Sequence, residues 1–303
     1  MTQIPYLDAA ELQRLVPMPD AIDALERMFR ASDVTVPQRS HLDVGGGDLL
    51  IMPAWGSAGA GVKLVTVNPS NPAAGRSLIN GVYVLFSPES LEPALMIDGA
   101  AVTALRTPAV SAVATRHLAA PDASRLVIFG GGTQAKGHLD AMLAIRPIES
   151  VVVVTRTESG ATALIEHARE RGLEARAGTP EDVRDADIVC TCTTSPSPLF
   201  EGAALSAGAH VNAVGAYKPD ARELDDVTIA RAVVVVEERT AALAEAGDLV
   251  MPIASGVLDR ANVHELSDVL RAGRPDGDVT VFKSVGLASE DLAVADAALA
   301  ALG

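Results

Sequence analysis

The sequence predicts an α/β protein: a Rossmann-type doubly wound parallel sheet domain plus an α+β domain. Three observations carry this prediction. The stretch 124–135 reads SRLVIFGGGTQA, a short apolar run followed by three glycines and the start of a segment that can be helical. From residue 124 onward, apolar runs alternate with helical segments, which is typical of parallel strands with helical crossovers. Residues 38–87 hold strand-like runs without helices between them, which indicates an antiparallel or mixed sheet.

Length and composition limit the classes of function. The 303 residues suffice for about two domains, and the 49% of hydrophobic residues allow a large core. The net charge of 24 − 39 = −15 argues against a nucleic-acid or anionic-membrane partner. Met1–Asp8 lacks the basic start and apolar run of a signal peptide, and no apolar run approaches the roughly 18 residues of a membrane span. Cys190 and Cys192 alternate in IVCTCTT, so we expect them to be buried rather than bridged, in a reducing cytoplasm.

The N-terminal part combines helices with strands. Asp8 and Asp20 are predicted caps of two short helices, and Asp98 is the predicted cap of a third, in which Pro108 marks either a kink or the true start. The predicted elements are helices 9–15 and 21–30, strands 38–42, 48–53, 61–67 and 80–87, and helix 99–119.

The remainder follows an alternating pattern. The predicted strands are 126–129, 150–155, 173–177, 186–191, 210–215, 232–237 and 279–285. The predicted helices are 134–145, 159–171, 179–184, a stretch from 238, 258–271 and 289–302.

The glycine turn after the first of these strands has the context of a dinucleotide site. Gly130 lets the chain turn sharply off the strand, and Gly132 lets the backbone approach a pyrophosphate. Ala135 is small enough for close packing of helix on sheet, and the helix start at Thr133 and Gln134 offers free N–H groups to the phosphates. We therefore predict that these residues bind a nicotinamide dinucleotide; the alternative is a glycine-rich turn without a ligand.

The end of the second strand of this domain predicts which dinucleotide is preferred. A carboxylate there binds a free ribose diol, whereas an Arg accommodates a 2′-phosphate. Here Thr155, Arg156 and Thr157 follow the strand, and Arg156 can form charge-assisted bonds to a phosphate. The sequence therefore favours NADPH, with NADH possible; the alternative is an ordinary exposed arginine.

Four further residues are predicted to lie near the cofactor. Thr194 follows strand 186–191, and Val214 stands near the end of strand 210–215. Lys283 and Ser284 lie in the segment FKSVG, near the expected domain junction. For Thr194, the alternative is a loop residue among prolines.

Several segments together resemble the ornithine cyclodeaminase/mu-crystallin family over nearly the whole chain. These segments are PQRSHL (37–42), GVKLVTVNPSN (61–71), ALRTPAVSAVAT (104–115), VIFGGGTQA (127–135), HVNAVGAYKPDARELDD (210–226), AGDL (246–249) and FKSVGLASEDLA (282–293). The resemblance implies a homodimer in which residues 1–120 and 287–303 form a substrate-binding and dimerisation domain and residues 121–286 the NAD(P)-binding Rossmann domain. It also implies a small amino or imino acid as substrate.

By the same resemblance, Arg39, Lys63 and Arg106 match the positions that hold the substrate carboxylate. The chemistry of two of them agrees: Arg106 can bind a carboxylate through two bonds and Lys63 adds a point charge. Both stand in apolar stretches, where a cation needs an anionic partner. The alternative is an ion pair with a protein carboxylate. His41 would share a strand face with Arg39.

One departure from the family pattern bears on the reaction. Cyclodeaminases of this family carry an aspartate that interacts with the reacting amine, and the matching position here is Tyr217, with Asp220 in the pattern PDxREL of the mu-crystallin-like branch. A phenol with a pKa of about 10 stays protonated at neutral pH and cannot pair with an ammonium group as an anion. RTPA in place of the commoner RTAA, which introduces Pro108, is a second departure.

We therefore predict an NAD(P)H-dependent oxidoreductase that reduces a cyclic ketimine, such as Δ1-pyrroline-2-carboxylate or Δ1-piperideine-2-carboxylate, to proline or pipecolate. Lys63, His41 and Tyr217 are the candidate proton donors, and no metal motif is present. The alternatives are an ornithine cyclodeaminase, an alanine dehydrogenase or opine-type enzyme, and a crystallin-like protein that binds NADPH or another ligand with little catalysis.

Overall fold

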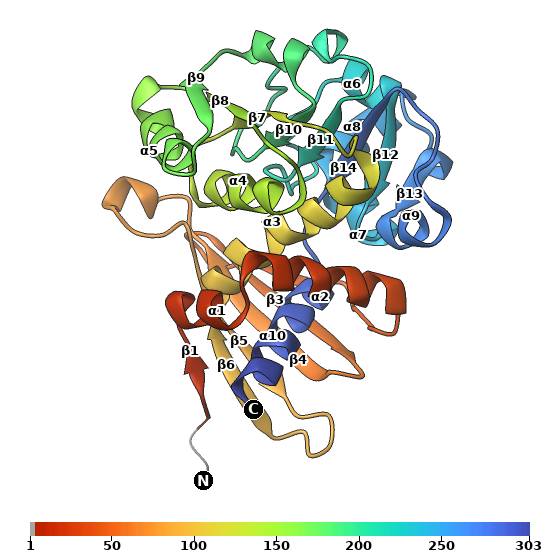
Figure 1. Cartoon of the computed structure of the whole chain (residues 1–303). Coiled ribbons are helices and arrows are strands. Elements are labelled where there is room, and N and C mark those ends of the chain that lie inside the picture. The colour runs from red at the N-terminus through yellow and green to blue at the C-terminus, as the bar shows by residue number, and fades with distance from the viewer. Residues whose placement is uncertain (1–3) are drawn as a thin grey trace. The chain divides into compact units, whose positions relative to one another are not determined.

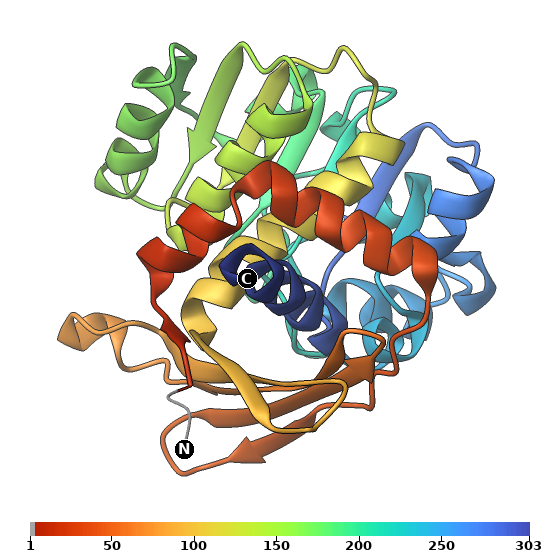
Figure 2. The same cartoon turned by 60° about the horizontal axis from the view of Figure 1, so that its bottom comes forward.

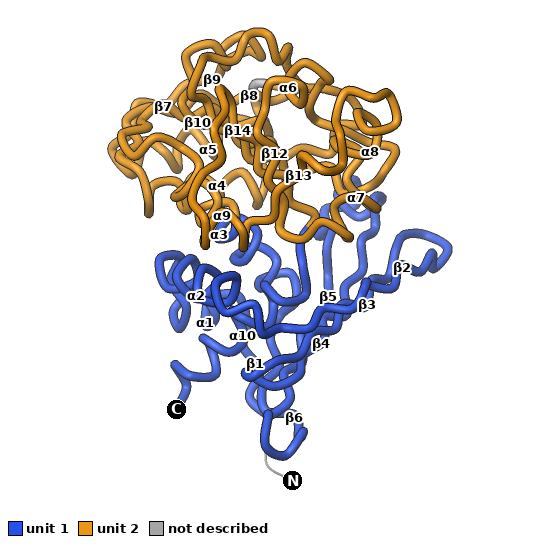
Figure 3. The backbone as a smooth tube through the Cα atoms, turned by 90° about the vertical axis from the view of Figure 1, so that its right-hand side faces the viewer, with its two compact units in different colours: residues 1–110, 286–303 blue, residues 111–285 orange. Residues whose placement is uncertain are grey.

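A computed structural model describes residues 4–303, so Met1–Gln3 of the segment considered as a signal peptide lie outside the described residues. The chain folds into two compact units, residues 1–110 with 286–303 and residues 111–285 (Figure 3). The boundary between them falls inside one helix, whereas the sequence placed it after residue 120. The roles of the two units as substrate and dinucleotide domains remain predictions.

The first unit is an antiparallel sheet covered by helices (Figure 1). Its sheet order is β1-β6-β5-β4-β3-β2, in which only β1 and β6 pair in parallel. The strands are β1 Tyr6–Leu7, β2 Ser40–Asp43, β3 Asp48–Gly56, β4 Gly59–Val67, β5 Ile79–Phe86 and β6 Pro93–Asp98. The helices are α1 Ala9–Leu15, α2 Met18–Ala31, α3 Gly99–Leu118, which continues into the second unit, α10 Ala288–Leu302 and the short 3-10 turn η1 Pro72–Ala74.

The terminal helix α10 lies between α2 and the sheet (Figure 2). Residues alternate between the faces of β3, β4 and β5, and the face that α10 covers is apolar except at a few positions. Lys63 of β4 stands on this face, directly between Met52 of β3 and Tyr83 of β5. The sheet thus carries a lysine into the core of the unit, where it is 1% exposed.

The second unit is a parallel sheet of eight strands in the order β9-β8-β7-β10-β11-β14-β12-β13. The strands are β7 Arg125–Phe129, β8 Ser150–Val154, β9 Glu174–Ala177, β10 Ile188–Thr191, β11 His210–Ala213, β12 Ala232–Val236, β13 Val263–Glu265 and β14 Val279–Lys283. The helices are α4 Thr133–Ile145, α5 Glu158–Arg169, α6 Asp226–Arg231, α7 Arg239–Glu245, α8 Gly247–Ala254 and α9 Leu266–Ala272, with 3-10 turns η2 Pro180–Asp185, η3 Gly202–Ala204 and η4 Arg260–Asn262. The direction of winding reverses between β7 and β10, as in a doubly wound sheet, which confirms the predicted fold class.

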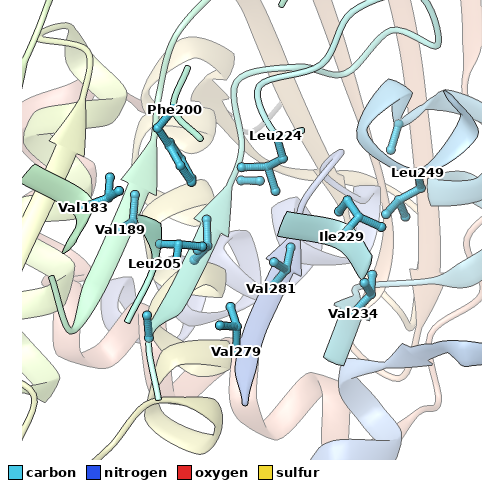
Figure 4. Packing of buried hydrophobic residues seen from close by; sticks show 14 of the residues in the cluster. Val183, Val189, Phe200, Leu205, Leu224, Ile229, Val234, Leu249, Val279 and Val281 are labelled. Atoms are coloured by element: carbon cyan, nitrogen blue, oxygen red, sulfur yellow. The ribbon is translucent and has the colours of Figure 1, made fainter. Parts of the chain in front are cut away.

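Aliphatic side chains fill the core of the second unit (Figure 4). Val189 of β10, Val281 of β14 and Val234 of β12 pack with Leu249 of α8 and Ile229 of α6 in one buried cluster. A parallel sheet buried on both faces requires such β-branched strands. This packing fixes the strand ends on which the candidate site stands.

Several predicted boundaries were wrong for identifiable reasons. Helix α2 begins at Met18 after Pro17, so Asp20 lies in its first turn and is not its cap, whereas Asp8 and Asp98 do accept bonds from the first-turn N–H groups of α1 and α3. Residues 258–271 are not one helix but η4, the strand β13 and α9. Pro108 stands inside α3, so the alternative start near it does not hold.

The prediction that both cysteines are buried was wrong for one of them. Cys190 and Cys192 are both free thiols, as expected, but Cys192 follows the end of β10 and is only half-buried. Cys190 is buried in the strand, and burial raises the pKa of its thiol to about 12. Within residues 4–303, no helix combines the length and apolar character that crossing a bilayer requires.

Two buried histidines of the second unit make its stability depend on pH. His138 Nδ1 lies 2.8 Å from Gln134 O and its Nε2 2.9 Å from Ser111 Oγ, while His210 lies 2.8 Å from Thr280 Oγ1. Burial lowers the pKa of His138 from its ordinary 6.5 to about 4 and that of His210 to about 3.

We therefore expect the free energy of unfolding to fall as the pH drops below about 6.5, by up to roughly 1.4 kcal/mol per pH unit for each histidine, because only the unfolded state takes up these protons. Urea unfolding at pH 7.5 and 5.5 measures this. The variant His138→Gln should reduce the slope, and an unchanged slope in that variant would contradict the assignment to His138.

Candidate functional site

The glycine turn of the second unit lies where the winding of the sheet reverses. Gly130 has φ +108°, donates its N–H to Val154 O at 2.9 Å, and has no room for a Cβ, which would lie 2.5 Å from Cys192 O. Such a backbone is strained for any residue but glycine. The turn therefore packs closely against the carboxyl ends of β8 and β10.

The next residues form the N-terminus of α4. Gly132 is the N-cap of α4, and a Cβ on it would meet no atom within 4 Å. Among the described residues, no side-chain hydrogen bond caps this helix end, which begins at Thr133. Ala135 is fully buried, which allows the close packing of α4 that the sequence predicted. A helix N-terminus beside open space fits a pyrophosphate.

The three residues after β8 lie as the sequence predicted, in a short loop before α5. Arg156 and Thr157 are exposed, and Thr155 is half-buried and donates its hydroxyl to Thr157 O at 2.7 Å. Thr157 is the N-cap of α5, whose N-terminus no described side chain caps. An exposed arginine beside a helix N-terminus can bind an anion.

Four other predicted cofactor residues differ in their surroundings. Thr194 is exposed in the loop after β10, and Val214 follows β11, with its N–H donated to Thr191 O at 3.1 Å. Lys283 and Ser284 are fully buried and bonded to the protein, since Lys283 Nζ lies 3.0 Å from Asp248 and Ser284 Oγ donates to Glu237 at 2.5 Å. A contact of these two side chains with a cofactor remains a prediction, and the structure gives both of them a structural role.

The first unit brings Lys63 and Arg106 together. Lys63 Nζ lies 2.8 Å from Asp291 Oδ1 and donates to Thr103 at 3.2 Å. Arg106, on α3, lies 3.0 Å from Glu290 and 3.5 Å from Asp291. Asp291 thus contacts both cations, and all four charged groups are buried. The alternative that the sequence left open, an ion pair with a protein carboxylate, is present for both cations.

Burial changes the acidity of this cluster. Loss of hydration lowers the pKa of Lys63 to about 8, against the opposing effect of Asp291. Gly286, at φ +77°, makes room for Arg106, because a Cβ there would lie 2.5 Å from Nη1. Lys63 can therefore both hold and release a proton near neutral pH.

The structure does not bring every predicted substrate residue into this cluster. His41 is on the edge strand β2, exposed, and 2.8 Å from Asp48. Arg39 is half-buried just before that strand. Tyr217 is half-buried in the second unit, after β11, with Lys218 Nζ 6.0 Å from its ring centroid. Among the side chains that the structure describes, no group of three or more His, Cys, Asp or Glu residues is arranged to hold a metal ion.

The residues that sequence reasoning missed are the carboxylates. Glu290 and Asp291 stand side by side in a terminal helix that is otherwise rich in alanine and leucine. Two adjacent acidic residues in such a helix were a signal of buried ion pairs, because ionised groups on an apolar face need partners.

Comparison with known proteins identifies the family of the chain. Residues 6–299 match the family described as "Ornithine cyclodeaminase/mu-crystallin family". A Δ1-pyrroline-2-carboxylate reductase of Bacillus cereus is 40% identical over 306 residues, 95% of this chain and 94% of its own. The structure of Thermococcus litoralis Δ1-pyrroline-2-carboxylate reductase in complex with NADH and L-proline superposes with a TM-score of 0.94 at 31% identity, over 98% of this chain and 97% of that one. An archaeal alanine dehydrogenase dimer with bound NAD has a TM-score of 0.93 at 30% identity, over 98% and 95%.

The family, the fold class and the expectation of an oxidoreductase are thereby confirmed, since the relatives named are reductases and dehydrogenases. With a family match over nearly its whole length and a relative at 40% identity, the chain belongs to the ornithine cyclodeaminase/mu-crystallin family.

Proposed function

We propose that this protein reduces a cyclic ketimine, with Δ1-pyrroline-2-carboxylate or Δ1-piperideine-2-carboxylate as substrate, to proline or pipecolate. The observation that carries the proposal is the buried cluster in which Lys63 and Arg106 share Asp291. Both cations have carboxylate partners within the protein, and burial lowers the pKa of Lys63 to about 8, which suits donation of a proton to an imine that bears a carboxylate. The relatives named as pyrroline-carboxylate reductases support the same substrate class.

The roles follow from the surroundings of each group. A bound nicotinamide dinucleotide supplies the hydride that the imine carbon accepts. The open N-terminus of α4 at Gly132 binds its pyrophosphate. Arg106 binds the substrate carboxylate, and Lys63 provides a positive charge and the proton that the imine nitrogen takes up as it becomes an amine. We further propose that Tyr217, Arg39 and His41 form hydrogen bonds with the substrate.

An assay of dinucleotide oxidation with five- and six-membered cyclic imines tests this proposal. We expect turnover by the wild type and a fall in kcat/KM of about 100-fold in Arg106→Lys, which keeps the charge but loses the planar fork of donors. Equal activity of that variant would remove Arg106 from substrate binding. Conversion of ornithine to proline and ammonia without added imine would favour a cyclodeaminase instead.

We further propose that NADPH is the preferred cofactor and that the protein acts as a homodimer. Arg156 and the uncapped start of α5 support the first part, although the similar structures hold NADH and NAD. One similar structure is a dimer.

Replacing Arg156 should move the preference between the two cofactors. We expect Arg156→Ala to lower kcat/KM for NADPH about tenfold and to leave the value for NADH within about twofold, because only the former carries the 2′-phosphate. Arg176, an exposed arginine paired with Asp182, provides the matched control, Arg176→Ala. A wild type that prefers NADH clearly would contradict this part of the proposal.

A further inference from the structure

The side chain of Glu223, in the second unit, accepts an unusually large number of hydrogen bonds. It is fully buried and accepts five of them. They come from Thr191 Oγ1 at 2.7 Å, from the N–H and hydroxyl of Thr193 at 2.9 and 2.7 Å, and from the N–H groups of Gly215 and Ala216 at 2.7 and 3.3 Å. None of the five donors is charged, so the carboxylate is held by neutral groups alone.

A closed ring of contacts holds this carboxylate in place. Asp248 Oδ1 accepts from the N–H of Glu223 at 2.7 Å and from that of Leu224 at 2.9 Å. Its other oxygen lies 3.0 Å from Lys283 Nζ, which donates to Ala216 O at 2.5 Å. Ala216 donates in turn to Glu223, which closes the ring. Since Glu223, Asp248 and Lys283 are all fully buried, water cannot replace these bonds.

The ring joins the carboxyl ends of three neighbouring strands. Thr191 ends β10, Gly215 and Ala216 follow β11, and Lys283 ends β14. In a doubly wound sheet, ligands bind outside the carboxyl ends of the strands. The two loops that Glu223 ties together carry Thr194 and Tyr217.

The close approach depends on a glycine. A Cβ at Gly215 would lie 2.5 Å from Glu223 Oε1 and 2.1 Å from Thr193 O, so any other residue would push the two loops apart. The glycine turn after β7 makes no contact of this kind with Glu223 among the hydrogen bonds of the described residues; it is held by Val154 and packs against Cys192. Glu223 would thus support the nicotinamide half of a dinucleotide directly, through Thr193 and Gly215, and the adenosine half only through Cys192, which stands between its two threonine donors.

We propose that Glu223 is a positioning residue that holds the loops after β10 and β11 in the conformation that the nicotinamide half of the cofactor requires. This inference rests on the proposed function, because it assumes that this sheet edge binds a dinucleotide. Glu223 acts through Thr193 and Gly215 and does not itself touch the reacting atoms.

The variant Glu223→Gln tests this role, because its amide group places donors against the N–H groups that now point at a carboxylate. We expect the affinity for ADP-ribose, which lacks nicotinamide, to stay within about twofold, while the affinity for the reduced dinucleotide falls about tenfold and kcat falls at least as much. Calorimetric titrations with ADP-ribose, NADH and NADPH give the affinities.

Asp187 provides a matched control at the amino ends of strands in the same sheet, opposite the carboxyl ends that Glu223 joins. It accepts from the N–H groups of Ser124 and Arg125 and from the Arg125 side chain, so Asp187→Asn also replaces a carboxylate oxygen by an amide donor and loses the charge that pairs with Arg125. We expect it to lower the thermal midpoint and to leave both affinities unchanged. If Glu223→Gln fails to fold, Thr193→Val removes one hydroxyl donor, and it should shift the ratio of the two affinities in the same direction.

An equal loss of both affinities in Glu223→Gln, or an unchanged affinity for the dinucleotide with unchanged kcat, would overturn the positioning role. A wild type that binds the dinucleotide but reduces no cyclic imine would refute the proposed reaction alone. The ratio of the ADP-ribose and dinucleotide affinities would still decide the role of Glu223.

Discussion

Replacing Lys63 by Met is expected to lower the free energy of unfolding by about 3–5 kcal/mol, because it leaves the buried carboxylate of Asp291 without its closest cation. Arg106 remains, but its Nε lies 3.5 Å from Asp291, beyond hydrogen-bonding distance. Urea or guanidinium unfolding followed by circular dichroism measures the change. Imine reduction should be lost in the same variant.

Two further variants separate the effect of an unpaired buried charge on stability from the effect of removing a lysine. In Lys63→Met/Asp291→Asn the uncompensated charge is gone, and most of the lost stability should return while activity does not. Lys136 is exposed on α4, so Lys136→Met should change stability by no more than about 0.5 kcal/mol. A stability loss in Lys63→Met no larger than that control would contradict the ion pair.

A side chain at Gly132 should abolish dinucleotide binding while the fold survives. A Cβ at this position meets no atom within 4 Å and the backbone is extended, so the Cβ of Gly132→Val has room within the protein. The isopropyl group would occupy the space beside the N-terminus of α4. We expect the affinity for NADH and NADPH to fall about 100-fold, and the stability to fall by about 1 kcal/mol because valine is a poor N-cap.

The same substitution in a turn of the first unit serves as the control. A Cβ on Gly46 also meets no atom within 4 Å, so Gly46→Val should leave both the fold and the affinity for dinucleotides unchanged. An affinity unchanged in Gly132→Val would place the pyrophosphate elsewhere.

Local patterns predicted most of the fold. The strand, glycine turn and helix at 125–145 could be read directly, because each depends on neighbours in sequence. The strands β1 and β6 were missed: the first has two residues, and the second begins at a proline and bears no clear alternation with polar residues. The strand β13, three residues long between η4 and α9, was absorbed into a helical pattern.

The site could be predicted only as far as single residues reveal chemistry. The apolar flanks of Lys63 and Arg106 indicated that each needs an anion, but its identity depends on Asp291, 228 residues away from Lys63. Glu223 lies in a polar segment, YKPDARELDD, in which no local pattern distinguishes it from the acidic residues beside it. Its burial follows from the convergence of three strand ends, which is a property of the topology and not of the local sequence.

The return of the chain to the first unit has a consequence for synthesis on the ribosome. The helix α10 covers the sheet and supplies Glu290 and Asp291, so the face that bears Lys63 lacks both its cover and its counterions until residues 288–302 leave the exit tunnel. The second unit is continuous from residue 111 to 285 and needs no later segment for its own sheet. We therefore expect the nascent chain to form the parallel sheet first, and a chain truncated before residue 286 to keep the N-terminal sheet open to chaperones and proteases.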